Sequence, residues 1–168
     1  MGVRTASRAT RGAWIGNKEA KMMRTVRQVI ESKPAGVWTI SPKAMAYDAL
    51  LVMAEKDVGA LLVVEEGKPV GIFSERDYAR KVILKGKSSR STCVADLMSH
   101  PVLYVRPEQT VDDCMALMTS KRVRHLPVMD GDKLVGVVSI GDVVKGIISE
   151  QEFTIRQLEN YISGSGFA

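Results

Sequence analysis

The chain is poor in aromatic residues, cysteine and histidine, and it has no long hydrophobic run. Aromatic residues make up 5% of its 168 residues, and it contains two cysteines and two histidines. No stretch approaches the ~18 apolar residues that a membrane-spanning helix needs, so we predict no membrane span. Cys93 and Cys114 form no CxxC pair and lie near no His/Asp cluster, which predicts reduced thiols rather than a disulfide framework or a zinc site.

The same shortages argue against catalysis and export. An active site needs a base, an orienting group and a nucleophile within reach of one another. Neither cysteine has an activating context, and histidine is scarce. We therefore predict that the chain is not an enzyme. It also lacks the apolar core of a secretory signal, which predicts a cytoplasmic location.

Acidic residues are missing from the first 18 positions, although the net charge of the chain is only +5. No apolar periodicity accompanies this basic stretch. We interpret residues 1–22 as a disordered leader, or as a start assigned too early, with Met22 or Met23 beginning the folded part. Composition alone also fits a nucleic-acid arm or a transit-like peptide. Aromatic residues are not interleaved with the charge, so nucleic acid is not expected as the main partner.

What the chain does contain is an internal repeat. Residues 37–83 align without a gap with residues 102–148, at a constant shift of 65 positions. Identical residues occupy 14 of these 47 positions. Upstream, residues 26–30 resemble residues 94–98 at a shift of 68, so the first copy carries three extra residues between these segments.

Each copy predicts the same order of elements from its apolar periodicity and turn residues. The predicted elements, copy one then copy two, are a short helix at 26–30 and 94–98, a strand at 37–40 and 102–105, an amphipathic helix beginning near 46 and 111, a hairpin of strands at 60–64 with 70–74 and 125–129 with 135–139, and a last helix from about 75 and 140. Thr110 is a suitable N-cap for the second amphipathic helix, with Asp113 in its first turn. Cys114 falls on the apolar face of that helix, as a small core residue.

A single copy would leave one apolar face of its sheet uncovered, and two copies packed together would cover it. We therefore predict an α/β (α+β) fold of two β-α-β-β-α repeats packed as a pseudo-symmetric pair. The predicted boundaries are 23–84 for repeat 1, 85–92 for a polar linker and 93–149 for repeat 2. A further apolar stripe predicts a C-terminal amphipathic helix at 150–164, whose apolar face must pack on this pair or on a second one.

Serine and aspartate recur at the same strand-to-helix junction, as Ser74 and Asp77 in copy one and as Ser139 and Asp142 in copy two. A structural interpretation is that the serine caps the helix and the aspartate favours the dipole of its first turn. A functional interpretation is that the carboxylate accepts hydrogen bonds from a ribose diol, while the hydroxyl and the helix N-terminus hold phosphate. These residues alone leave both interpretations open.

Copy two also has Arg124 and His125 directly before a strand, where a guanidinium and an imidazole suit a phosphate. Copy one has glycine and alanine at the equivalent places, so the copies are chemically unequal. The alternative is a solvated charge run at the end of a helix. We favour phosphate binding for Arg124 and His125, and the charge run for Lys121 and Arg122.

The two junctions, residues 71–77 (GIFSERD) and 136–142 (GVVSIGD), resemble the Ghx[ST]xxD signature of CBS domains. Residues 124–128 (RHLPV) resemble the strand that precedes this signature. The resemblance covers about residues 25–149, and the whole stretch is similar to small bacterial and plant organellar proteins made of one CBS pair, a Bateman module.

The resemblance implies two nucleotide-binding clefts, in which the start of one copy holds the base and the end of the other holds ribose and phosphate. The implied residues of cleft A are Ala35, Gly36, Val37, Val58, Gly59, Arg124, His125, Ser139, Gly141 and Asp142. The implied residues of cleft B are Met98, His100, Val102, Val123, Arg124, Ala60, Ser74, Arg76 and Asp77. This assignment gives cleft A the stronger grip on phosphate.

The resemblance also implies a regulatory role. The expected ligand is an adenine nucleotide, with AMP as the first choice among AMP, ADP, ATP and NAD(H), and no catalytic cofactor is expected. The module would sense cellular energy or redox state and act on an unknown protein effector or through a homodimer of modules. The alternative is a protein or nucleic-acid interaction module without ligand sensing.

Overall fold

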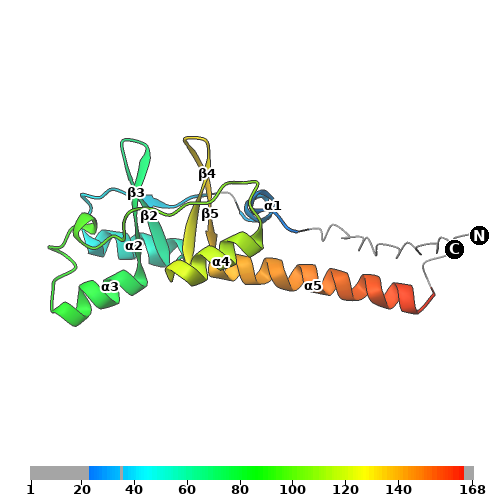
Figure 1. Ribbon diagram of the computed structural model, residues 1–168. Helices are drawn as coiled ribbons and strands as arrows, with labels where there is room; N and C mark the ends of the chain where they lie inside the picture. The colour runs from blue at the N-terminus through cyan, green and yellow to red at the C-terminus, as the bar shows by residue number, and fades with distance from the viewer. Residues whose placement is uncertain (1–22, 35, 165–168) are drawn as a thin grey trace, which may run out of the picture.

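The computed structural model describes residues 23–34 and 36–164 (Figure 1). The predicted leader, residues 1–22, lies outside the described residues, and so does Ala35. The elements are, in chain order, α1 (Val26–Glu31), β1 (Thr39–Ile40), α2 (Ala46–Lys56), β2 (Ala60–Glu65), β3 (Lys68–Ser74), α3 (Glu75–Lys81), η1 (Ile83–Lys85), η2 (Val94–Asp96), α4 (Val111–Lys121), β4 (His125–Asp130), β5 (Lys133–Ser139) and α5 (Ile140–Ile162). This mixed order confirms the predicted fold class of two repeated units.

Each repeat is built around an antiparallel hairpin, β2–β3 in repeat 1 and β4–β5 in repeat 2. Both hairpins shift register at equivalent places, between Val63 and Val64 and between Val128 and Met129. Figure 1 shows the two hairpin turns along one edge of the molecule and helices α3, α4 and α5 along the opposite edge. The strand-to-helix junctions therefore lie near the helical edge in both repeats.

The predicted strand at 102–105 is wrong in extent. In repeat 1, β1 pairs with β2, whereas repeat 2 has only an isolated bridge between Val105 and Val128. The difference follows from one proline. The Leu62 N–H donates to the Trp38 carbonyl at 3.1 Å, but the residue equivalent to Leu62 is Pro127, which has no N–H to extend the ladder.

Each repeat contributes its first helical segment to the core of the other repeat. Val26 and Val29 of α1 belong to the core of repeat 2. Val94 and Leu97, in and just after η2, belong to the core of repeat 1. Because of this exchange, each core is complete only when both repeats are present, and burial of apolar surface stabilises the pair as one unit.

Two of the repeated glycines are explained by this exchange. A Cβ on Gly136 would lie 2.9 Å from Cγ2 of Ile30 in α1. A Cβ on Gly71 would lie 2.4 Å from Sδ of Met98. The exchanged segments thus approach each hairpin so closely that only glycine fits without movement.

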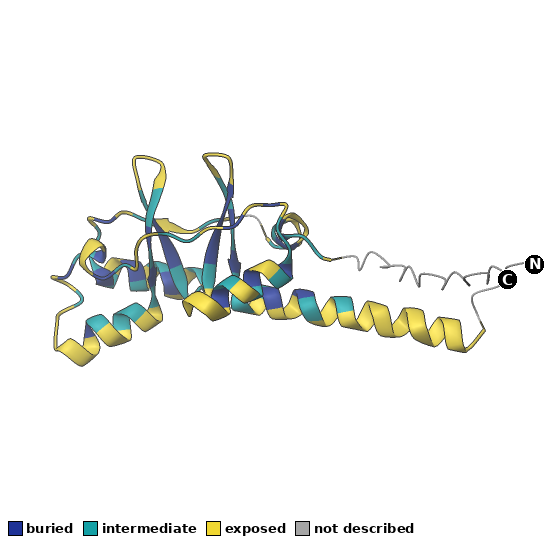
Figure 2. Ribbon diagram, in the orientation of Figure 1, coloured by how far each residue is buried: buried dark blue, intermediate teal, exposed yellow. Residues whose placement is uncertain are grey.

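Helix α5 spans 23 residues and joins two helices that were predicted separately. The predicted C-terminal helix at 150–164 is the second half of α5, and Gly146 lies inside the continuous helix. A Cβ on Gly146 would lie 3.1 Å from Cγ1 of Val111, so the glycine allows α5 to pack closely on α4. Residues 151–164 are all exposed (Figure 2), so the described part of this chain does not cover their apolar side chains. Within the described residues, no helix has the length and hydropathy to cross a membrane.

Helix α4 begins as predicted. Thr110 is its N-cap, and Asp113 completes a capping box. Cys114 is buried in the core of repeat 2, which confirms its predicted structural role. Burial, with a smaller contribution from the charge of Asp113, raises the pKa of its thiol to about 11, so the side chain stays a neutral thiol at physiological pH.

Candidate functional site

Two cavities open between the repeats, and residues of both copies line each one. Cleft A has a volume of about 870 Å³ and cleft B about 960 Å³. Gly59, Ile72, His125 and Ser139 line both cavities, so they form the wall between them. Both volumes are sufficient for a nucleotide-sized ligand.

The repeated serines and aspartates form a capping box at each cleft. Ser74 is the N-cap of α3, and Ser139 is the N-cap of α5. Oδ2 of Asp142 accepts hydrogen bonds from the Ser139 N–H at 2.8 Å and from its hydroxyl at 2.9 Å. Oδ2 of Asp77 accepts the same pair from Ser74, at 3.0 and 2.7 Å. The structural interpretation is therefore correct for both copies, and it fixes each carboxylate at its junction.

The two carboxylates differ in their remaining partners. Oδ1 of Asp77 accepts a hydrogen bond from the Ser99 hydroxyl at 2.9 Å and pairs with Nζ of Lys81 at 3.0 Å. For Asp142, Nζ of Lys33 donates to Oδ2 at 2.7 Å and also to the Val137 carbonyl at 3.0 Å. Every hydrogen bond from the described residues to Asp142 reaches Oδ2, so Oδ1 retains its acceptor capacity.

Both carboxylates stay ionised at neutral pH. Burial alone would raise the pKa of Asp77, but hydrogen bonds from Ser74, Lys81 and Ser99 outweigh it and hold the pKa below 3.8. Burial likewise opposes ionisation of Asp142, and the hydrogen bonds and charge of Lys33, together with Ser139, lower its pKa below 3.8. An ionised carboxylate accepts hydrogen bonds only, which suits a diol donor.

Most of the predicted cleft A residues meet around one cavity. Those that line it are Gly36, Val37, Val58, Gly59, His125 and Ser139. Asp142 does not line it directly, but Lys33, which does, binds its carboxylate. Arg124 and Gly141 line cleft B instead. Cleft A therefore lacks the arginine on which its predicted phosphate grip depended.

Most of the predicted cleft B residues also come together. Those that line it are Ser74, Arg76, Asp77, His100, Val102, Val123 and Arg124. Ala60 lines cleft A instead. Met98 packs against Gly71 and the core of repeat 1, so it supports the cleft from behind rather than facing it.

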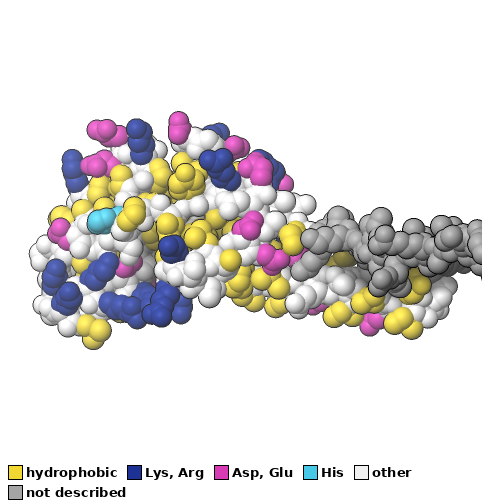
Figure 3. All heavy atoms as spheres, viewed as in Figure 1, with side chains coloured by type: hydrophobic (Ala, Val, Ile, Leu, Met, Phe, Trp, Pro, Cys, Tyr) yellow, Lys and Arg dark blue, Asp and Glu magenta, His cyan; other side chains and the backbone are white. Residues whose placement is uncertain are grey.

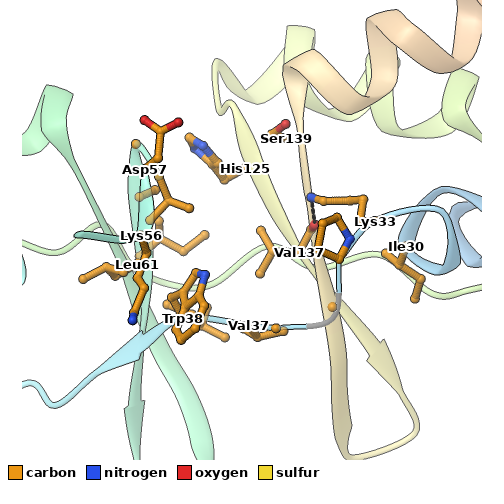
Figure 4. A pocket seen from close by; sticks show the side chains of 18 of the residues that line it. Ile30, Lys33, Val37, Trp38, Lys56, Asp57, Leu61, His125, Val137 and Ser139 are labelled. Atoms are coloured by element: carbon orange, nitrogen blue, oxygen red, sulfur yellow. Dashed lines mark hydrogen bonds between the residues drawn. The ribbon is translucent and has the colours of Figure 1, made fainter. Parts of the chain in front are cut away.

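Sequence reasoning missed the aromatic wall of cleft A. Trp38 is 41% exposed and lines this cavity, with Nζ of Lys56 at 4.8 Å from its ring centroid. In Figure 4, Trp38 and Lys56 project from repeat 1, opposite His125 and Ser139 of repeat 2. The equivalent residue in repeat 2 is Leu103, which lines cleft B. The alignment of the copies already pairs Trp38 with Leu103, and this exchange of an aromatic for an aliphatic side chain is the signal that could have pointed to it.

Sequence reasoning also missed how many basic residues border cleft B. Its lining includes Arg80, Lys81, Lys121 and Arg122 in addition to the predicted arginines. Lys121 and Arg122 are exposed at the end of α4, as the charge-run interpretation expected, yet they face this cavity. Arg122 adopts a left-handed backbone (φ 54°), which turns the chain from α4 toward β4 beside the cleft.

His125 is the polar group shared by both clefts. Burial is the main cause that lowers its pKa below 6.5, and the positive charges of Lys33 and Arg124 add to it, while Asp142 opposes them. His125 is therefore mostly neutral at physiological pH and serves there as a hydrogen-bonding group rather than as a cation.

Comparison with known proteins identifies the family of the chain. The CBS domain family matches residues 26–83 and 94–149. The chain belongs to the CBS-domain family. It is 40% identical over 149 residues to the Arabidopsis thaliana protein named CBS domain-containing protein CBSX3, mitochondrial, an alignment that covers 83% of this chain and 72% of that protein.

Solved structures share the fold of this CBS pair. A CBS-domain protein from Burkholderia ambifaria MC40-6 is 51% identical, with a TM-score of 0.73, over 76% of this chain and 96% of that chain. The CBS-domain pair of the protein MJ0100, solved with 5′-methylthioadenosine and S-adenosyl-L-methionine, is 23% identical, with a TM-score of 0.67, over 76% of this chain and 98% of that chain. At that identity the likeness concerns the fold alone. A CBS pair is a regulatory module.

Proposed function

We propose that this CBS pair is a non-catalytic sensor that binds an adenine nucleotide in its clefts, with AMP the first choice for cleft A, and signals energy or redox state to a protein effector or through its own dimer. The observation that carries the proposal is the pair of ionised carboxylates, Asp77 and Asp142, each fixed by a capping box at the N-terminus of a helix. The bound adenosine ligands of MJ0100 support the same chemistry on this fold.

Three parts of a nucleotide find matching groups in or beside cleft A. The ribose diol can donate to the carboxylate of Asp142, which lies outside the direct lining but is bound by Lys33 of that lining, because Oδ1 keeps its acceptor capacity. The base can lie against Trp38 and the aliphatic wall of Val37 and Val58. A single phosphate can approach the N-terminus of α5 at Ser139, where the helix dipole favours an anion.

Calorimetric titration of AMP into the Asp142→Ala variant tests the ribose assignment. We expect the affinity to fall about tenfold or more, which corresponds to about 1.4 kcal/mol of lost binding free energy. Because this change also removes a capping box, Asp113→Ala is the matched control: the box of α4 has no residue in either cleft lining, whereas the box of α5 includes Ser139, which lines both. Unchanged AMP affinity in Asp142→Ala, with normal folding, would reject the assignment.

We propose a second copy of the chain as the occupant of the exposed face of α5. Val144, Ile148, Ile155, Leu158 and Ile162 are all exposed and are spaced as the seam of a coiled coil, with Gln151 in the remaining place. Such a seam matches another helix of the same period. Arg156 lies beside it among Glu152 and Glu159, so a paired copy can set opposite charges together.

A cytoplasmic location is part of the proposal. The Arabidopsis relative carries the word mitochondrial in its name, which makes an organellar location the alternative. Cell fractionation of the full chain separates the two. Recovery in an organellar fraction would overturn the location and would leave the clefts and their ligands unaffected.

A further inference from the structure

The rim of cleft B has an excess of positive charge. Six basic side chains and two acidic ones line this cavity, so basic groups exceed acidic groups by four. The basic residues are Arg76, Arg80, Lys81, Lys121, Arg122 and Arg124. Figure 3 shows Lys and Arg side chains gathered at the lower edge of the molecule, where α3 approaches α4.

Most of these six cations form no ion pair with a carboxylate of the described residues. Lys81 is engaged, because its Nζ donates to the Leu97 carbonyl at 2.7 Å and pairs with Asp77. Among the described residues, no carboxylate forms an ion pair with the other five. Like charges held together in this way repel one another, and a multiply charged anion relieves that repulsion.

The five unpaired cations come from two elements that face each other across the cavity. Arg76 and Arg80 stand one turn apart on α3, in repeat 1. The other three lie at the end of α4 in repeat 2 or just after it: Lys121 is its last residue, and Arg122 and Arg124 follow. A phosphate chain in this cavity can therefore contact guanidinium and ammonium groups of both repeats.

Cleft A has no comparable charge. Two basic and two acidic side chains line it, namely Lys33, Lys56, Glu31 and Asp57. Lys33 is committed to Asp142, and Lys56 pairs with Glu55 and lies over Trp38. Only one cleft thus offers free cations to a ligand with several negative charges.

We propose that cleft B selects an adenosine ligand with a di- or triphosphate chain, whereas cleft A takes an adenosine ligand with at most one phosphate. The inference rests on the proposed function, since it assumes that both clefts hold an adenosine. It reverses the phosphate preference that the sequence assigned to the clefts. It also means that the protein can bind two different ligands at once, one in each cleft.

Two tryptophan reporters distinguish the clefts. The chain has two tryptophans, Trp14 and Trp38, so a Trp14→Phe protein reports on cleft A through Trp38 alone. A second protein, with Trp14→Phe, Trp38→Phe and Leu103→Trp, reports on cleft B from the equivalent position. Each protein is titrated with adenosine, AMP, ADP, ATP and inorganic tripolyphosphate, at low and at high salt.

In the cleft B reporter we expect ATP to bind at least tenfold more tightly than adenosine, with a preference that weakens at high salt because the cations are exposed. Adding Arg80→Gln and Lys121→Gln should remove most of that preference and leave adenosine binding unchanged. The matched control is Lys133→Gln with Lys145→Gln, which removes two exposed cations outside both linings. In the cleft A reporter ATP should show no advantage over AMP.

The outcomes separate this inference from the function on which it rests. Equal affinities of cleft B for adenosine and ATP, or a preference that survives Arg80→Gln with Lys121→Gln, would overturn the inference and leave the adenosine sensor intact. Binding of tripolyphosphate but of no adenosine compound would overturn the proposed function and retain the anion site. No response in either reporter, checked by calorimetry on the unmodified chain, would overturn both.

Discussion

Each cleft lies beside a strand-to-helix junction with a carboxylate in a capping box, but the walls of the two clefts differ in their aromatic and charged side chains. Cleft A has Trp38 and a balanced set of charges, whereas cleft B has Leu103 and a surplus of arginine and lysine. Some identical positions have backbone roles, such as helix capping at Ser74 and Ser139 or close approach at Gly71 and Gly136. The repeat thus keeps the shape of the chain and varies some of the aromatic and charged side chains that line the clefts, which is how one fold can provide two different sites.

The two repeats differ most in the length of their last helix. Substitutions in the longer one, α5, should have the largest effect of those predicted, a change of oligomeric state. Helix α3 has 7 residues, whereas α5 continues for 23. We expect Leu158→Asp with Ile162→Asp to convert a dimer into a monomer, because both side chains are exposed and lie on the predicted seam. Light scattering coupled to size exclusion measures this change. Asn160→Asp adds charge on the opposite face and should leave the dimer intact, and a monomeric unmodified chain would contradict the prediction.

Replacing the two glycines at which the exchanged segments approach the hairpins should have a smaller effect, on the free energy of unfolding, and the loss should differ between them. Gly136→Ala forces a Cβ against Ile30, which is β-branched and stiff, so we expect a loss of ~1–3 kcal/mol in the free energy of unfolding. Gly71→Ala meets Met98, whose flexible side chain can move aside, so its loss should be smaller. Urea unfolding measures both. A double-mutant cycle with Ile30→Ala should show coupling for Gly136, and additive effects would contradict the proposed contact.

The residue that contacts the base differs between the clefts, and replacing it should change the free energy of binding by an amount comparable to the glycine effects or smaller. Stacking of a base on an aromatic side chain contributes ~1–3 kcal/mol by alanine substitution. We therefore expect Trp38→Ala to weaken AMP binding in cleft A about tenfold, and Leu103→Ala to change cleft B only a few-fold, because leucine offers no aromatic face. Calorimetry on both variants measures the difference. Equal losses would mean that the base does not stack on Trp38.

The sequence predicted the repeated elements well, because apolar periodicity and capping residues act locally. Thr110 and Asp113 begin α4 as expected, and the hairpins lie where the turn residues placed them. The exchange of α1 and η2 between cores was not predictable, since periodicity shows that a face is buried but not what buries it. The contact between Lys33 and Asp142 joins residues 109 positions apart, and no local pattern marks it. The cleft that each basic residue borders depends on the same long-range packing.

The smallest expected effect is a change of stability with pH that depends on His125, one of the residues in the wall between the clefts. Its pKa in the folded chain is lowered below the 6.5 of an unfolded chain, mainly because burial disfavours the charged form. The unfolded chain therefore binds more protons as the pH falls through 6.5, so stability is fully present above this pH and decreases below it. Asp77 and Asp142 do not contribute in this window, because their pKa values lie below 3.8.

Unfolding by urea between pH 7.5 and pH 5 should show this loss, and His125→Gln should flatten it. His100→Gln is the matched control, because His100 is exposed and lines cleft B only. An anionic ligand near His125 favours the protonated imidazole, so binding should take up less than one proton per chain, most clearly near the lowered pKa. Calorimetry in buffers of different ionisation enthalpy measures that uptake. If the uptake persists in His125→Gln, another group couples the clefts to pH, and the shared wall is not the point at which protonation acts on both.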